Sequence, residues 1–169
     1  MNLREQILKE HSRENCDAIV SWVGNNQKRF DELFSLFTND EYRVLQRSSW
    51  PLSYCVEAHP TFIKKHFAIL FNKIKRPNIP DAVKRNTLRL LQFVTIPEKY
   101  HGEVMNICFE LSQSMQEKPA AKMFCLVILE KLSKLYPEIK PELFLIIETQ
   151  MPYESIAFKN RGKKILAKK

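Results

Sequence analysis

Two histidines lie near turns that contain proline, and histidine is the side chain that most readily exchanges a proton near neutral pH. His59 precedes Pro60, and His101 follows Pro97 by four residues. General acid–base catalysis needs a second group, such as a carboxylate, thiol or hydroxyl, placed within hydrogen-bond reach. Neither histidine has such a neighbour at a typical spacing. The sequence therefore predicts polar turn residues, and no catalytic residue is assigned.

The four cysteines are the other candidates for reactive or metal-binding groups. They are Cys16, Cys55, Cys108 and Cys125. None forms a Cys-x-x-Cys pair and no histidine supplies a close second ligand, so a zinc site is not predicted. Each cysteine lies within a helical pattern, which indicates a reduced, buried thiol. The three glycines are far apart, which argues against a glycine-rich phosphate or dinucleotide loop, and no metal or cofactor is expected.

Basic side chains form two clusters within a chain of formal net charge +8. Residues 64–89 carry eight Lys or Arg against one acidic residue, and residues 153–169 carry six against one. Such clusters suit nucleic acids, anionic surfaces or acidic proteins, although a solvated face or a polar cap has the same composition. The candidate anion- or partner-binding residues are Lys73, Lys75, Arg76, Lys84, Arg85 and Arg89 in the first cluster and Lys159, Arg161, Lys163 and Lys164 in the second.

Helices must position these side chains, because apolar residues recur at helical spacing through most of the chain. Hydrophobic residues make up 44% of the sequence, including eleven Phe, which predicts a folded core. The clearest amphipathic stripe is Phe30, Leu33, Phe34 and Phe37. Few alternating patterns typical of strands occur. The predicted fold class is all-α.

A repeating unit organises residues 40–151: an apolar helix, a turn with proline, a second apolar helix, then a break. The turn prolines are Pro60, Pro97 and Pro137, which lie 37 and 40 residues apart. A period near forty with paired helices is typical of HEAT and armadillo repeats. The sequence therefore predicts a HEAT- or armadillo-like right-handed superhelix of stacked antiparallel helix pairs, with about nine or ten helices.

A single domain is predicted over residues 1–169, since a chain of this length can bury one continuous core. Capping helices are expected at both ends, with three helix pairs between them. The expected ranges are 1–38 for the N-terminal cap, 40–76, 80–116 and 119–151 for the helix pairs, and 153–169 for the C-terminal cap.

Several finer expectations follow from the same patterns. In the first pair, Pro51 is expected to kink the first helix and Pro60 to begin the second. Met115 is expected to continue the buried face of its helix. The residues of the C-terminal cap expected to pack inward are Ile156, Ala157, Ile165 and Leu166.

Three segments closely resemble the C-terminal part of a group of small bacterial HEAT-like proteins. They are Ala120-Ala121-Lys122, Lys140-Pro141-Glu142-Leu143-Phe144-Leu145-Ile146-Ile147-Glu148 and Ala157-Phe158-Lys159-Asn160-Arg161-Gly162-Lys163-Lys164-Ile165-Leu166. The segment from Tyr42 to Pro60, with Trp50, resembles the group more loosely. The resemblance covers roughly residues 40–169 and implies a HEAT-like helical stack without an established activity.

Short chains of this group are sometimes labelled adenylosuccinate lyase. The signature loop of that superfamily resembles Gly-Ser-Ser-x-Met-Pro-x-Lys-x-Asn. Here Met151-Pro152-Tyr153 and Lys159-Asn160 match fragments of the loop at a different spacing, and its Gly-Ser-Ser is absent. Members of that superfamily are also far longer chains, which form tetramers with shared sites. The sequence therefore argues against lyase activity, and no enzyme is predicted.

Two hypotheses for function follow. The first is a non-enzymatic protein-interaction or scaffold module, because stacked helix pairs expose an extended surface. The alternative is a basic nucleic-acid-binding protein that contacts the phosphate backbone, with an architecture distantly similar to that of alkylpurine DNA glycosylases. The sequence shows no signal-peptide pattern and no apolar run long enough to span a membrane, so a cytoplasmic location is expected, and a monomer is favoured.

Overall fold

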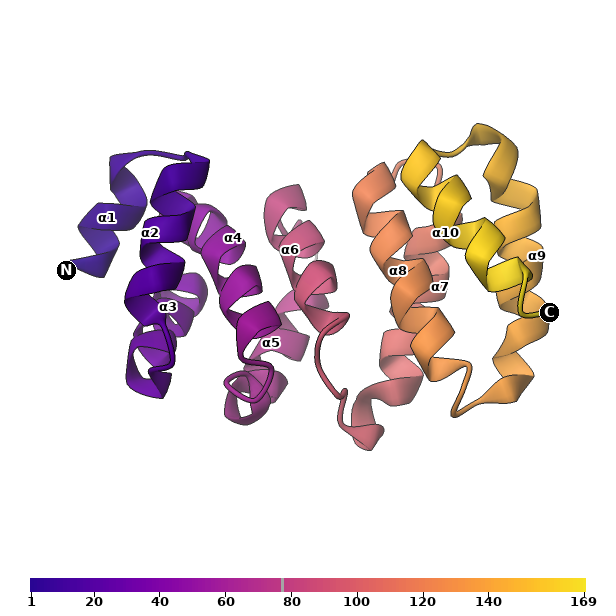
Figure 1. Cartoon of the computed structure of the whole chain (residues 1–169), viewed down its shortest axis with the longest axis horizontal. Helices are drawn as coiled ribbons and strands as arrows, with labels where there is room; N and C mark the ends of the chain where they lie inside the picture. Colours follow the sequence, from indigo (N-terminus) through magenta and orange to yellow (C-terminus); the bar gives the residue numbers. More distant parts are fainter. Residues whose placement is uncertain (77) are drawn as a thin grey trace. The chain divides into compact units, whose positions relative to one another are not determined.

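The computed structural model describes residues 1–76 and 78–169. These residues form ten α-helices and four short 3-10 helices, and they contain no β-strand (Figure 1). The predicted all-α class and number of helices are confirmed. Contacts between Cα atoms divide the chain into two compact units, Met1–Thr95 and Ile96–Lys169. Each unit has its own packing, and the single continuous domain stays a prediction.

The N-terminal unit contains six α-helices. They are α1 (Leu3–Lys9), α2 (Arg13–Val23), α3 (Gln27–Asn39), α4 (Tyr42–Ala58), α5 (Phe67–Ile74) and α6 (Asp81–Leu91). The central helix is α4, which packs against α3 and α6 and also contacts α1 and α2. Figure 1 shows α4 and α6 side by side in one layer, with α5 behind them. Pro51 lies buried within α4, and the kink predicted there stays a prediction.

Local signals explain where the first three helices begin and end. Asn2, Ser12 and Asn26 each accept a hydrogen bond from the backbone N–H three residues later, which satisfies a donor that the helix itself leaves unpaired. Gly24 follows the last residue of α2 with a φ of +48°, a conformation that favours glycine. The predicted stripe on α3 is buried along its whole length.

The second helix of the pair predicted over 40–76 begins later than expected. After Pro60 the chain forms a turn, then a 3-10 helix over Lys64–His66, and α5 begins only at Phe67. The prediction that Pro60 begins the helix is therefore wrong. Phe62 and Ile63 are buried although they precede the helix, and their apolar side chains produced the misleading pattern. Backbone hydrogen bonds here span three residues, which is the tighter 3-10 geometry.

The C-terminal unit contains four α-helices and three 3-10 helices. They are η2 (Glu98–Tyr100), α7 (His101–Gln113), α8 (Pro119–Leu132), η3 (Pro137–Ile139), α9 (Lys140–Gln150), η4 (Met151–Tyr153) and α10 (Ile156–Leu166). Helix α8 packs against α7 and α10, and α9 contacts all three other helices. The pair predicted over 80–116 thus has α6 in the first unit and α7 in the second.

The buried face of α10 differs from the one predicted. Phe158, Gly162 and Ile165 are buried at spacings of four and three residues, whereas Ile156 is 78% exposed and Ala157 is also exposed. The prediction was right for Ile165 and wrong for Ile156 and Ala157. Ser155 caps the helix, so Ile156 lies in its first turn, on the side that faces solvent.

Met115 is a second apolar residue that does not pack as predicted. It is 86% exposed because α7 ends at Gln113 and Met115 lies in the turn that follows. In contrast, all four cysteines are buried and free, as expected. Burial raises the pKa of Cys16 to about 11 and that of Cys55 to about 12, so both thiols are protonated and unreactive near neutral pH.

Candidate partner-binding site

Lys73, a candidate binding residue, is buried rather than exposed. Only 7% of its surface is accessible, its Nζ donates a hydrogen bond to the Thr38 carbonyl over 3.3 Å, and it lies 5.1 Å from the centroid of the Phe37 ring. Burial, and to a lesser degree the charge of Arg76, lower the pKa of Lys73. The side chain fastens α5 to α3 and is removed from the candidate surface.

Arg89 is also occupied by contacts within its own unit. Its guanidinium forms an ion pair with Glu57 and lies 4.1 Å from the centroid of the Tyr54 ring. It also donates a hydrogen bond to Ser53 Oγ over 3.3 Å. All three partners belong to α4, so Arg89 attaches α6 to α4. It offers little to a partner.

The other candidates of the first cluster remain at or near the surface. Lys75 and Arg76 are exposed just after α5, and Lys75 Nζ lies 5.4 Å from the centroid of the Phe71 ring. On α6, Arg85 is exposed and Lys84 is half-buried. The first cluster therefore offers four of its six predicted residues.

In the C-terminal unit, Glu130 of α8 organises the second cluster. Its carboxylate is nearly buried and forms ion pairs with Arg161 and with Lys168, whose Nζ lies 2.7 Å from Oε1. Burial alone would raise the pKa of Glu130, but the hydrogen bond from Lys168 and the charges of Arg161, Lys168 and Lys134 outweigh it and lower the pKa. Arg161 therefore ties α10 to α8 instead of facing a partner.

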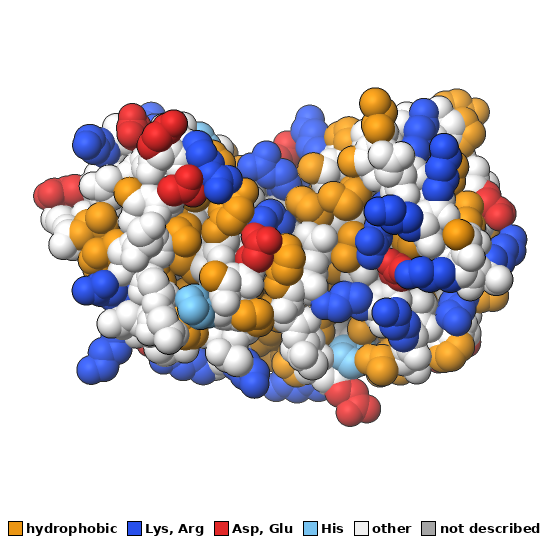
Figure 2. Space-filling view, viewed as in Figure 1, with side chains coloured by type: hydrophobic (Ala, Val, Ile, Leu, Met, Phe, Trp, Pro, Cys, Tyr) orange, Lys and Arg blue, Asp and Glu red, His pale blue; other side chains and the backbone are white. Residues whose placement is uncertain are grey.

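Lysines surround this paired carboxylate. Figure 2 shows Lys and Arg side chains gathered over α8 and α10. Cations are favoured at the C-terminal ends of helices, where the helix dipole is negative, so part of this pattern is structural. Lys163 and Lys164 are exposed and Lys159 is half-buried. The α8–α10 basic surface is defined as Lys131, Lys134, Lys159, Lys163, Lys164 and Lys168.

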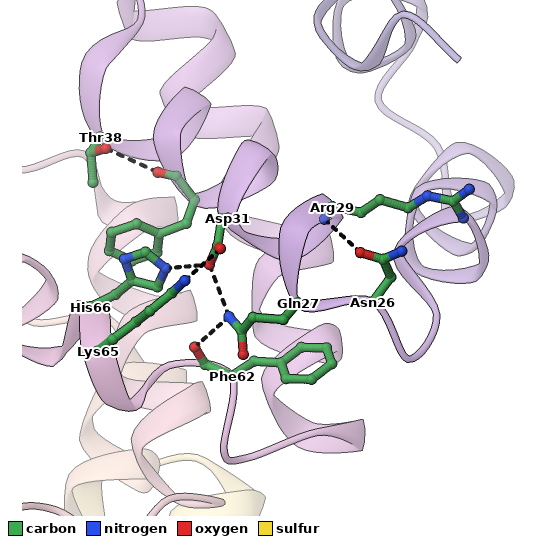
Figure 3. A network of polar contacts seen from close by, with 9 residues as sticks. Asn26, Gln27, Arg29, Asp31, Thr38, Phe62, Lys65 and His66 are labelled. Carbon is green, nitrogen blue, oxygen red and sulfur yellow. Dashed lines mark hydrogen bonds and ion pairs between the residues drawn. The ribbon is translucent and has the colours of Figure 1, made fainter.

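Asp31 is the centre of a polar network that the sequence did not reveal (Figure 3). Its carboxylate accepts a hydrogen bond from Lys65 Nζ over 2.6 Å and lies 2.6 Å from His66 Nε2. Gln27 Nε2 donates to the same carboxylate and to the Phe62 carbonyl. The network fastens the 3-10 segment before α5 to α3. Its members lie 34 to 35 residues apart, and no short motif connects them.

Replacing Asp31 with Asn is expected to lower the free energy of unfolding by about 1–2 kcal/mol at pH 7, after allowance for solvent screening. Burial opposes ionisation of Asp31, but hydrogen bonds from Lys65, His66 and Gln27 outweigh burial and lower its pKa to about 2. A lowered folded-state pKa contributes stability above the unfolded value near 4, and that contribution is lost as the pH falls towards 2.

Urea denaturation at pH 7 and pH 2.5 measures the effect of Asp31→Asn. The difference from the wild type should shrink strongly at the lower pH. Asp17→Asn is the matched control, because Asp17 forms an exposed ion pair with Arg13 within one helix, and its loss should cost less than 0.5 kcal/mol, roughly. An Asp31 effect of equal size at both pH values would contradict the assignment.

Both histidines that the sequence singled out make structural contacts. The buried His101 has Nε2 2.8 Å from the Ile96 carbonyl and Nδ1 2.9 Å from the Tyr136 hydroxyl. The His59 ring stacks on Phe62. In the part of the chain that the structure describes, no three His, Cys, Asp or Glu residues gather where they could hold a metal ion.

A sequence model of the HEAT repeat domain matches residues 3–169. The chain belongs to the HEAT repeat family. The match extends over all ten helices of this HEAT repeat domain, in agreement with the helical-repeat resemblance of its sequence. HEAT repeats generally mediate protein interactions or scaffolding, and the family is typically non-enzymatic. Comparison with curated proteins and with solved structures found no match.

The helices of this HEAT repeat domain differ from membrane spans in length and apolar content. Within residues 1–76 and 78–169, none of them combines the two to the degree that crossing a bilayer requires. The predicted location and oligomeric state stay predictions.

Proposed function

We propose that this HEAT repeat domain is a non-enzymatic protein-interaction module whose α8–α10 basic surface binds an acidic segment of a partner protein. One observation supports this most directly. Glu130 is already compensated by Arg161 and Lys168, so the lysines around it leave an excess of positive charge on one surface. A surface of this kind attracts acidic partners and accelerates their encounter.

The nature of the exposed cations favours a protein partner over nucleic acid. Arginine suits phosphate groups through its planar, bidentate geometry, but Arg89 and Arg161 are both bound to carboxylates of this chain. The cations left on the α8–α10 basic surface are lysines, which act as point charges on flexible stems. Such side chains can adapt to irregularly spaced carboxylates of an acidic segment.

Replacing Lys163 and Lys164 together with Ala is expected to weaken binding of a glutamate-rich peptide about three- to tenfold, because each exposed charge contributes a few tenths to 1 kcal/mol. Fluorescence anisotropy of a labelled peptide at low and at physiological salt measures the effect. The matched control is Lys9→Ala with Lys28→Ala, two exposed lysines of the N-terminal unit, which changes the net charge equally. The control should retain wild-type affinity.

Duplex DNA is the comparison ligand, since the nucleic-acid alternative shares the same net charge. Tighter binding of DNA than of the peptide, lost in Arg76→Ala with Arg85→Ala and falling steeply with salt, would favour that alternative. If neither ligand binds at low salt, the proposed function is wrong.

A further inference from the structure

A pocket of about 80 Å³ lies within the C-terminal unit, between α8, α9 and α10. Its lining residues are Glu130, Ser133, Lys134, Lys140, Phe144, Ile165 and Lys168. This volume has room for a few water molecules or one small oxyanion, but not for a nucleotide or a drug-sized ligand.

The charges of the lining do not cancel. Three lysines and one glutamate line the pocket, which leaves a net charge of +2. Glu130 is also bound by Arg161, which is not a lining residue, and the hydrogen bond from Lys168 holds that lysine at the pocket. Lys134 and Lys140 reach the pocket from the end of α8 and the start of α9. Repulsion between these cations is relieved only by an anion.

We infer that this pocket binds a phosphoryl group. A phosphomonoester carries close to two negative charges at pH 7 and has three strong acceptor oxygens, which matches a net charge of +2 and three ammonium groups. A carboxylate has one charge and would leave part of the positive charge uncompensated. Phe144 and Ile165 form apolar parts of the wall, where the lower local polarity strengthens an ionic contact.

The pocket refines the proposed function, on which the identity of the partner rests. Lys134 and Lys168 belong both to the α8–α10 basic surface and to the lining. An acidic segment bound along that surface can therefore place one phosphorylated side chain in the pocket. The partner is accordingly an acidic protein segment that carries a phosphoserine or phosphothreonine.

Three glutamate-rich peptides that differ only at a central Ser, Glu or phosphoserine test the inference. The wild type should bind the phosphoserine peptide at least tenfold more tightly than the serine peptide, roughly a 1.4 kcal/mol difference. Replacing Lys134 and Lys140 together with Ala should reduce this preference to about twofold. Lys163→Ala with Lys164→Ala is the control, because it should weaken all three peptides and keep the preference.

Inorganic phosphate separates a free ion from a phosphorylated side chain as the source. It should shift the backbone amide resonances of Ser133 and Lys134 in the wild type, but not in the variant with Lys134→Ala and Lys140→Ala. If phosphate gives these shifts and the phosphopeptide has no advantage, the oxyanion pocket is supported, with the free ion as ligand. If no peptide binds but phosphate does, only the proposed function fails. Equal binding of all three peptides together with no phosphate-induced shift overturns the inference.

Discussion

Replacing Glu154 with Gln is expected to lower the free energy of unfolding of the C-terminal unit by about 3 kcal/mol. Glu154 forms an ion pair with Lys122 of α8, and the two side chains are only 9% and 4% exposed. The pair joins α8 to the segment between η4 and α10. Removal of the carboxylate charge leaves the Lys122 ammonium uncompensated in a poorly solvated site, which costs far more than loss of a surface pair.

A double replacement separates this desolvation cost from a general loss of packing. Lys122→Met with Glu154→Leu removes both charges, and its stability should lie within about 1 kcal/mol of the wild type. Glu148→Gln is the matched control, because Glu148 pairs with Lys169 at the surface and should contribute less than 0.5 kcal/mol, roughly. Urea denaturation and hydrogen exchange of the α8 and α10 amides measure these differences. If Glu154→Gln costs no more than Glu148→Gln, the buried pair is not important for stability.

Replacing Gly162 with Ala is expected to destabilise the C-terminal unit by about 2 kcal/mol, although Ala is the better helix former. A Cβ at position 162 would lie 2.7 Å from Ile147 Cγ2 and 3.2 Å from Met151 Cε. The glycine therefore sets how closely α10 approaches α9. To admit the methyl group, the two helices must separate or side chains of the core must leave their preferred rotamers.

Gly102→Ala is the natural control for Gly162→Ala. Gly102 also lies in a helix, but a Cβ there would have no heavy atom within 4 Å. This replacement should stabilise the unit by up to about 1 kcal/mol, because Ala loses less conformational entropy than Gly on forming a helix. Chemical denaturation of both variants gives the comparison. Two changes of the same sign would contradict the close approach of α10 and α9.

The sequence by itself determined the features that depend on a few neighbouring residues. The all-α class, the buried stripe of α3 and the turn at Gly24 follow from spacings of three to seven residues and from the conformational freedom of glycine. The spacing of the turn prolines, near forty residues, was enough to indicate a HEAT-like repeat. Such signals are local or regular, so the order of residues is enough to read them.

Tertiary structure decided which side of each helix is buried and which charges are already paired. Ile156 and Phe158 are both apolar and lie in the first turn of α10, yet only Phe158 is buried. Arg161 and Lys163 look equivalent in the sequence, yet Arg161 is bound to Glu130 and Lys163 is exposed.

The reason is the distance along the chain between interacting residues. The contacts of Asp31 with His66, Glu57 with Arg89 and Lys122 with Glu154 join residues 35, 32 and 32 positions apart, close to one repeat. The repeat period predicts this separation, but not which of many polar side chains will meet. That choice depends on the rotation and spacing of packed helices, which only the folded chain determines.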